Sequence, residues 1–383
     1  LVQQCREAPG TVPELAKRFF ADEYRLDHRI HTYPKPLICW AHGHVLGGGM
    51  GLMQGAAIRI VTPSSRLGMP EINIGLFPDV GGSWFLARLP GKLGLFLGLT
   101  AASINARDAL DLDLADRFLR DDQQDALLDG LMQMNWQQQA PEQLNSLLRA
   151  LEHEARPDLP PAQWLPRRER IDAQLDVAEL PAAWHALSAL QGDDDPLLAR
   201  AAKTLAAGCP LTAHLVWQQI RRARHLSLAE VFRMEYAMSL NCCRHPEFPE
   251  GVRARLIDKD QAPKWHWPDP AAIPAAVIAA LGYGIAPVLV GALGGAARLA
   301  LGGARWALGT ARGRKVGRDL LRAVAVHRFS LLAVLPVTLL ALVSGPGIFD
   351  QLPDVQRAWL DVADGRTGPR DGFVAVVALG AVT

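Results

Sequence analysis

Hydrophobic and polar positions in the first third of the chain alternate between helical and strand-like spacing. Apolar residues recur at roughly helical spacing over residues 13–32, which predicts an amphipathic helix, and Pro34 and Pro36 mark its end. Short apolar runs bounded by turn residues follow at 37–40 and 58–61, as expected of buried strands. Helices and strands in this alternating order indicate an α/β fold. Further elements expected here are a helix over 50–57, a strand over 65–69, and helices over 94–99 and 106–114.

Composition divides the chain into three zones. Residues 1–116 combine both spacings with many glycines and are predicted to form the α/β core. Residues 117–268 are polar, charged and mostly helical in period; the clearest helix covers 228–240, where Ser227 and Glu230 have the spacing of a capping box. Residues 269–383 are rich in Ala, Gly, Leu and Val and form an apolar, arginine-interrupted tail. Two other helices expected in the middle zone cover 142–155 and 212–223.

The tail contains two uncharged stretches long enough to be considered for a bilayer-spanning helix. The stretch 329–349 is dense in leucine and valine, whereas 270–297 is mostly alanine and glycine and is interrupted by Pro274 and Pro287. An arginine-rich segment lies between them, and such segments stay on the cytoplasmic side. We therefore expect a membrane-type helical tail that contacts the membrane through 329–349 and leaves the preceding part cytoplasmic. A fused tail with little bearing on the rest of the chain is the alternative.

Charge and cysteine content exclude several classes of protein. The 40 Lys and Arg residues balance 39 Asp and Glu residues, so the chain lacks the basic excess that nucleic-acid binding requires. The five cysteines are odd in number and contain no CxxC pair, which argues against a disulfide scaffold or a zinc site and favours a reducing compartment.

No signal peptide is visible, and both ends, at Leu1 and at Thr383 within an apolar run, lead us to expect a piece of a longer protein.

A glycine-rich turn follows the first predicted strand. Gly47, Gly48 and Gly49 stand between that strand and the predicted helix over 50–57. Glycines let a backbone approach a ligand closely, and a helix N-terminus presents unpaired N–H groups at the positive end of its dipole. This arrangement suits the oxyanion that develops from a thioester carbonyl. A tight turn needed only for packing is the alternative, and the spacing does not match a dinucleotide-binding fingerprint.

Two acids stand in an apolar loop rich in glycine and proline. Glu71 and Asp79 lie within residues 69–82, and burial there would raise their pKa values and prepare them for proton transfer. The structural alternative is that Glu71 caps the end of a strand and Asp79 caps a turn that Gly81 assists.

These motifs together resemble the enoyl-CoA hydratase/isomerase, or crotonase, superfamily. The resemblance is closest to its 3-hydroxyisobutyryl-CoA hydrolase branch and covers about residues 10–268. The superfamily motifs are Lys35-Pro36, Gly47-Gly48-Gly49, and Pro70-Glu71 followed by Gly75, Pro78, Gly81 and Gly82. The branch motifs are 23–26 (EYRL), 31–36 (HTYPKP), 74–83 (IGLFPDVGGS), 97–100 (LGLT), 234–236 (MEY), 250–253 (EGVR), 256–260 (LIDKD) and 263–265 (PKW).

The choice of branch has a chemical basis. A hydratase of this superfamily uses two glutamates, and the position of one of them is Gly51 here. The other, Glu71, is present, and Asp79 stands where hydratases tend to carry a small residue. The pattern resembles that of the hydrolases, in which such a pair acts on a thioester.

The resemblance implies a spiral of β-β-α units, followed by a helical region, and a thioester hydrolase. Gly48 N–H, with Gly47 and Gly49 beside it, would bind the thioester oxygen. Glu71 would attack the carbonyl or activate water, and Asp79 would orient the 3-hydroxyl group or the water. The substrate would be a short 3-hydroxyacyl-CoA, as in valine breakdown, with CoA as part of the substrate and no separate cofactor or metal.

The resemblance also implies a homo-oligomer, a trimer in most members. It places the second oxyanion donor upstream of residue 1, so this piece is not expected to catalyse alone. Two alternatives stay open. One is a hydratase or isomerase, and the other is a non-catalytic, membrane-associated domain of the same fold.

Overall fold

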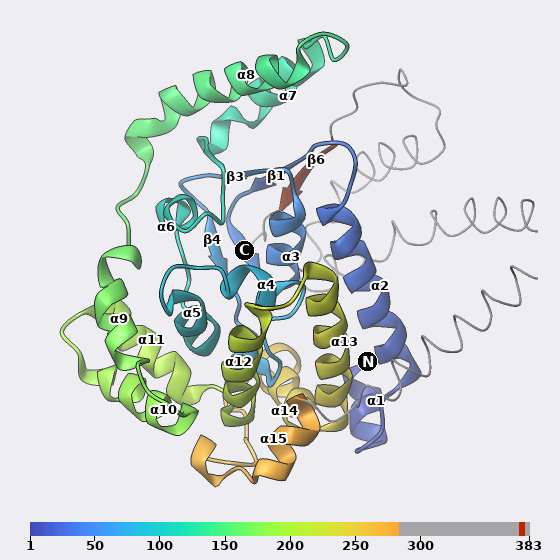
Figure 1. The fold of residues 1–383 in the computed structure, drawn as a ribbon, viewed down its shortest axis with the longest axis vertical. Coiled ribbons are helices and arrows are strands. Elements are labelled where there is room, and N and C mark those ends of the chain that lie inside the picture. Colours follow the sequence, from blue (N-terminus) through green and yellow to red (C-terminus); the bar gives the residue numbers. More distant parts are fainter. Residues whose placement is uncertain (283–374, 380–383) are drawn as a thin grey trace, which may run out of the picture. The chain divides into compact units, whose positions relative to one another are not determined.

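The computed structural model describes residues 1–282 and 375–379, which lie in one compact unit (Figure 1). Its strands are β1 (Leu37–Ala41), β2 (His44–Leu46), β3 (Ile58–Val61), β4 (Arg66–Gly68), β5 (Arg117–Phe118) and β6 (Ala375–Leu379). Its α-helices are α1 (Val2–Glu7), α2 (Glu14–His31), α3 (Gly48–Gly55), α4 (Gly82–Leu86), α5 (Leu93–Thr100), α6 (Ala106–Asp111), α7 (Gln124–Gln133), α8 (Ala140–Ala155), α9 (Arg168–Gln174), α10 (Leu180–Ser188), α11 (Pro196–Ala207), α12 (Pro210–Ala223), α13 (Leu228–Arg244), α14 (Glu247–Val252) and α15 (Ala275–Gly282). Short helical turns are η1 (Glu71–Ile74), η2 (Asp121–Gln123), η3 (Arg156–Asp158), η4 (Leu165–Arg167), η5 (Ala189–Gly192), η6 (Arg253–Ile257, a π-helix) and η7 (Pro270–Ala272).

The described strands form two parallel sheets, which confirms the α/β fold expected from the sequence. One sheet has the order β5-β3-β1-β6, and the other pairs β2 with β4. Every pairing between these strands is parallel. In the larger sheet Ile38 lies opposite Ile58 on one side and opposite Val376 on the other. The apolar stretch at the end of the tail thus supplies a strand beside β1.

Strand β1 is buried on both faces, which explains why its sequence is apolar without alternation. Ile38 and Trp40 pack with Ile60 and with leucines of the α7–α8 hairpin. Cys39 and Ala41 point to the other face, into the main core that the remaining helices cover. The larger cluster continues from there to α2, α5, α12 and α13, so the glycine turn after β1 is set between the sheet and these helices.

Helix α2 confirms the predicted amphipathic helix but not every residue of its apolar stripe. Its buried positions are Ala16, Phe20, Tyr24 and Asp27, whereas Leu15, counted in the stripe from spacing alone, is 47% exposed. An acid thus occupies the buried face in place of an aliphatic residue. The helix packs against α3 and α13.

Most other predicted elements agree with the structure within a few residues. The capping box at Ser227 is present, since its side chain accepts the Glu230 N–H and the Glu230 carboxylate accepts the Ser227 N–H. Among the elements not predicted, three lie around the candidate site: β2 just before the glycine turn, and η1 and α4 in the acid-bearing loop. They are three to five residues long, too short to show a period.

The first part of the weaker apolar stretch packs on the compact unit. Val277 and Ile278 contact the core, and the Asn241 side chain donates a hydrogen bond to the Leu281 carbonyl oxygen at 3.1 Å.

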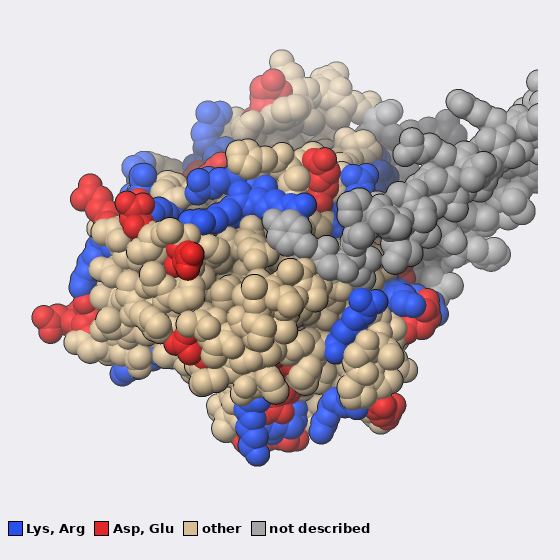
Figure 2. Space-filling view, turned by 60° about the horizontal axis from the view of Figure 1, so that its bottom comes forward, with Lys and Arg blue, Asp and Glu red and all other residues tan. Residues whose placement is uncertain are grey.

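Figure 2 shows the underside of the molecule, where a broad area lacks Lys, Arg, Asp and Glu side chains. Among the described residues, no helix has the length and hydropathy to cross a bilayer. The predicted membrane contact at 329–349 lies outside the described residues.

Candidate functional site

The glycine turn leaves a backbone amide free at the start of α3. Gly47 adopts φ +51°, a left-handed value that favours glycine, and its N–H donates to the Gly68 carbonyl oxygen at 3.1 Å. The Gly47 carbonyl oxygen accepts the N–H groups of Met50 and Gly51. Within the described residues no acceptor takes the Gly48 N–H, as is usual in a first helical turn. An anionic oxygen placed there would receive this hydrogen bond.

Glu71 lies directly against this turn. A β-carbon built on Gly47 would be only 2.7 Å from Glu71 Oε1, so the absence of a side chain at Gly47 makes room for the carboxyl group. Glu71 is 5% exposed, and its Oε2 atom has no hydrogen-bond partner among the described residues. Burial, and then the nearby Asp79 carboxyl, raise the pKa of Glu71 well above its usual range.

Asp79 enters the same region from a strained turn. It is 5% exposed, and the Tyr24 hydroxyl donates a hydrogen bond to its Oδ2 atom at 2.7 Å. The next two residues, Val80 and Gly81, have φ values of +51° and +85°. Burial raises the pKa of Asp79 to about 6, while the hydrogen bond from Tyr24 acts in the opposite direction.

Helix α2 brings two further acids to the site. Glu23 Oε1 lies 3.7 Å from the position of a β-carbon on Gly48, and burial and Asp79 raise its pKa well above the usual range. Asp27 is 1% exposed, its Oδ2 atom has no partner among the described residues, and burial also raises its pKa well above normal.

Glu235 on α13 is the fifth acid of this group, and it fixes the loop that carries Asp79. Its two carboxyl oxygens accept the N–H groups of Gly81 at 2.8 Å and Ser83 at 2.9 Å. These are unpaired donors at the start of the short helix α4. Burial raises the pKa of Glu235 to about 8 even though these hydrogen bonds lower it.

These five acids gather without a basic partner. In the part of the chain that the structure describes, none of them forms an ion pair. No group of His, Cys, Asp and Glu within residues 1–282 has the arrangement of a metal site. Neighbouring carboxyl groups without a positive partner do not all ionise near neutral pH, so some of these acids keep their protons.

Gly51 has no space for a side chain. A β-carbon there would meet the Val80 side chain at 2.6 Å and the Val80 carbonyl oxygen at 2.9 Å. A second glutamate of the hydratase type therefore does not fit at this position while Val80 keeps its place. The structural feature that excludes it is the same turn that directs Asp79 inward.

The structure thus brings together the residues that the sequence singled out. Glu71 contacts the Gly47–Gly48 turn, and Asp79 lies close enough to affect the Glu71 pKa. Their catalytic roles stay predictions. Glu23, Tyr24, Asp27, Glu235 and Ser239 had no role predicted from the sequence, although Glu23, Tyr24 and Glu235 stand in the branch motifs 23–26 and 234–236. Asp27 is a polar residue on the buried face of α2, and Ser239 lies on α13.

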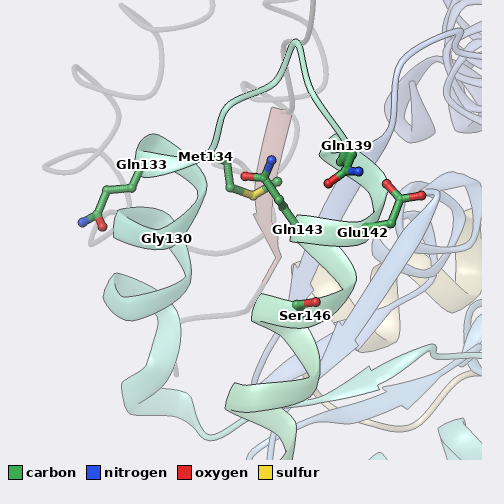
Figure 3. Close-up of a pocket in the computed structure, with 7 residues that line it drawn as sticks. All are labelled: Gly130, Gln133, Met134, Gln139, Glu142, Gln143 and Ser146. Atoms are coloured by element: carbon green, nitrogen blue, oxygen red, sulfur yellow. The ribbon is translucent and has the colours of Figure 1, made fainter.

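A separate hollow of about 410 Å³ opens between α7 and α8 (Figure 3). It is lined by Gly130, Gln133, Met134, Gln139, Glu142, Gln143 and Ser146. The close-up shows amide and carboxylate side chains around an open rim, and no residue of the acid cluster takes part. We take the acid cluster as the candidate site because buried acids lie beside a free backbone amide there.

Several known proteins are similar to this chain in sequence over about two thirds of its length. A family profile described as "Enoyl-CoA hydratase/isomerase" matches residues 1–281. A protein of Danio rerio described as "3-hydroxyisobutyryl-CoA hydrolase, mitochondrial" is 36% identical over 252 residues, which cover 66% of this chain and 65% of that protein. The human protein of the same description is 34% identical over 264 residues, covering 69% and 67%. The chain spans about two thirds of the length of these relatives.

Solved structures agree on the fold. A crystal structure of an enoyl-CoA hydratase from Rhodobacter sphaeroides 2.4.1 is 33% identical with a TM-score of 0.60, covering 71% of this chain and 75% of that one. A carnitinyl-CoA dehydratase from Mycobacterium thermoresistibile is 32% identical with a TM-score of 0.62 and the same coverage.

Proposed function

Because the chain belongs to the enoyl-CoA hydratase/isomerase family, we propose that it acts on an acyl-CoA thioester and hydrolyses a short 3-hydroxyacyl-CoA to free CoA and a 3-hydroxy acid. The carrying observation is the contact between the Glu71 carboxyl group and the Gly47–Gly48 turn. It places a buried acid beside a free amide donor. The similarity to 3-hydroxyisobutyryl-CoA hydrolases favours a 3-hydroxyisobutyryl group as the acyl chain.

The geometry supports a simple order of events. The thioester oxygen accepts the Gly48 N–H, and the carbonyl carbon then lies near Glu71. In its ionised form, Glu71 either takes a proton from water as the water attacks this carbon, or attacks it directly to give a mixed anhydride that water then cleaves. The carbon–sulfur bond breaks, and the proton is returned to the CoA sulfur. Asp79 orients the water or the 3-hydroxyl group.

Two features favour hydrolysis over hydration. Hydration by this family uses a second acid at the position of Gly51, and Val80 fills the space where its side chain would begin. The acid that is present instead, Asp79, carries a pKa of about 6 and is mostly ionised at neutral pH.

Product analysis tests the proposal. The full-length gene product is incubated with 3-hydroxyisobutyryl-CoA and, separately, with crotonyl-CoA. We expect free thiol and 3-hydroxyisobutyrate from the first, and little hydration of the second. Hydration of crotonyl-CoA without thiol release would instead assign the hydratase reaction, which the similarity to solved hydratases makes the second candidate.

A further inference from the structure

Helix α13 supports the acid-bearing loop at two positions one turn apart. Glu235 holds the loop backbone through the N–H groups of Gly81 and Ser83. Ser239, four residues further along, lies 2.6 Å from the Tyr24 hydroxyl, and both side chains are buried. Tyr24 in turn contacts Asp79. One helix therefore fixes both the backbone and, through Tyr24, the carboxyl group of the same loop.

The direction of these hydrogen bonds follows from counting protons. A tyrosine hydroxyl carries one hydrogen, and the Tyr24 hydroxyl donates it to Asp79 Oδ2. The contact with Ser239 must then run the other way, with the Ser239 hydroxyl donating to the Tyr24 oxygen. Donation into the tyrosine oxygen makes its own hydrogen a stronger donor. The result is a directed chain from Ser239 through Tyr24 to Asp79.

The Tyr24 ring is held independently of its hydroxyl. Its centroid lies 5.8 Å from that of Phe20 and 6.0 Å from that of Phe232. These contacts come from α2 itself and from α13, and aromatic packing of this kind keeps a ring in place. Removing only the hydroxyl should therefore leave the ring where it is and change the hydrogen bond alone.

We propose that Tyr24, oriented by Ser239, is a positioning residue whose hydroxyl directs the Asp79 carboxyl group toward the Glu71–Gly48 centre. This inference rests on the proposed hydrolase function for its catalytic consequence. Tyr24 does not touch the reacting atoms in this account; it acts through Asp79. Without the hydroxyl, Asp79 would lose the one side-chain donor that the structure gives it.

The charge around Asp79 makes this donor necessary. The titratable groups that interact with it electrostatically are Glu23, Tyr24 and Asp27 from α2, Glu71 from η1, and Glu235 and Cys242 from α13. All are acids or weak acids, so none provides a positive charge to stabilise an ionised Asp79. The tyrosine hydrogen bond is the contact that lowers its pKa most.

Three variants of the full-length protein test the inference: Tyr24→Phe, Ser239→Ala and, as a matched control, Tyr236→Phe. The Tyr236 hydroxyl also links α13 to α2, but it donates to the Lys17 carbonyl oxygen and not to Asp79. Two properties are measured from about pH 5 to about pH 9: the rate of thiol release, and the free energy of unfolding in urea. The difference in unfolding free energy between variant and parent follows the protonation of Asp79 without requiring activity.

We expect Tyr24→Phe to move the acid limb of the rate profile, and the step in stability that Asp79 causes, to higher pH by about one to two units. Ser239→Ala should move both in the same direction by a smaller amount, and Tyr236→Phe should leave both in place. If Tyr24→Phe behaves like Tyr236→Phe in both measurements, the inference is overturned. If the stability step moves but the parent protein hydrolyses no thioester, the positioning contact stands and the proposed function fails.

Discussion

A β-carbon on Gly51 would lie 2.6 Å from the β-carbon of Val80, closer than two such atoms can approach. The contact involves a turn at positive φ and the Val80 carbonyl oxygen, which cannot move as freely as the end of a long side chain. We therefore expect Gly51→Ala to lower the free energy of unfolding by about 1–3 kcal/mol, as overpacking does. Urea denaturation would measure this directly.

Gly49→Ala is the matched control, because it lies in the same helix and its β-carbon would meet Val45 at 3.4 Å, an ordinary contact. The gain in helix propensity should make this variant as stable as the parent or more stable by up to about 1 kcal/mol. Equal losses in both variants would show that the turn at Val80 does not restrict position 51.

Gly47→Ala should disable the site while leaving the protein folded. The new methyl group would lie only 2.7 Å from Glu71 Oε1, so the carboxyl group must move away from the turn. A displacement of about 1 Å at a reacting group can reduce the rate about 100-fold, and we expect a loss of at least that size in thiol release. A crystal structure of the variant would show the displaced carboxyl group.

Gly10→Ala separates this effect from backbone strain. Gly10 also has a left-handed conformation, with φ +81°, but a β-carbon there would meet nothing within 4 Å. It should cost about 1–2 kcal/mol of stability without the loss of rate. A Gly47→Ala protein with the rate of Gly10→Ala would contradict the role of the turn.

Asp79→Asn should stabilise the protein at neutral pH while it removes activity. Burial raises the folded-state pKa of Asp79 to about 6, above the ordinary value of 3.8. The group therefore contributes stability that is fully present below about pH 4 and is lost as the pH rises through about 6. A shift of about two units corresponds to roughly 3 kcal/mol, and the asparagine, which cannot ionise, should recover much of it near pH 7.5.

The measurement for this prediction is the free energy of unfolding against pH. The parent should lose stability between about pH 4 and pH 7, and Asp79→Asn should show a flatter curve over that interval, since asparagine still accepts the hydrogen bond from Tyr24. A variant that is less stable than the parent at every pH would show that Asp79 is not destabilised by its burial.

The sequence predicts most elements that have a long period or a clear boundary. Helix α2 lies within one residue, at each end, of the range 13–32 that the spacing predicts, and Pro34 and Pro36 mark its end. Helix α13 was recognised at its start because Ser227 and Glu230 cap it locally. These signals involve neighbouring residues, so a single sequence is sufficient to detect them.

What the sequence could not predict depends on contacts between distant positions. Tyr24 meets Asp79 across 55 residues, and Glu235 meets Gly81 across 154. Helix α4 is short and depends on Glu235 to accept its first N–H groups, so nothing within its own five residues indicates it. The pairing of β6 with β1 likewise joins the two ends of the chain.

The catalytic part of the account depends on Glu71, and the rate of thiol release by Glu71→Gln is its most direct test. Glu247→Gln is the matched control: Glu247 is also buried, with a pKa raised to about 7, but its carboxyl group accepts the His266 N–H instead of facing the glycine turn. With 3-hydroxyisobutyryl-CoA as substrate, we predict a loss of at least about 100-fold for Glu71→Gln and a change of a few-fold at most for Glu247→Gln. A Glu71→Gln protein that folds and releases thiol at nearly the parent rate would contradict the account.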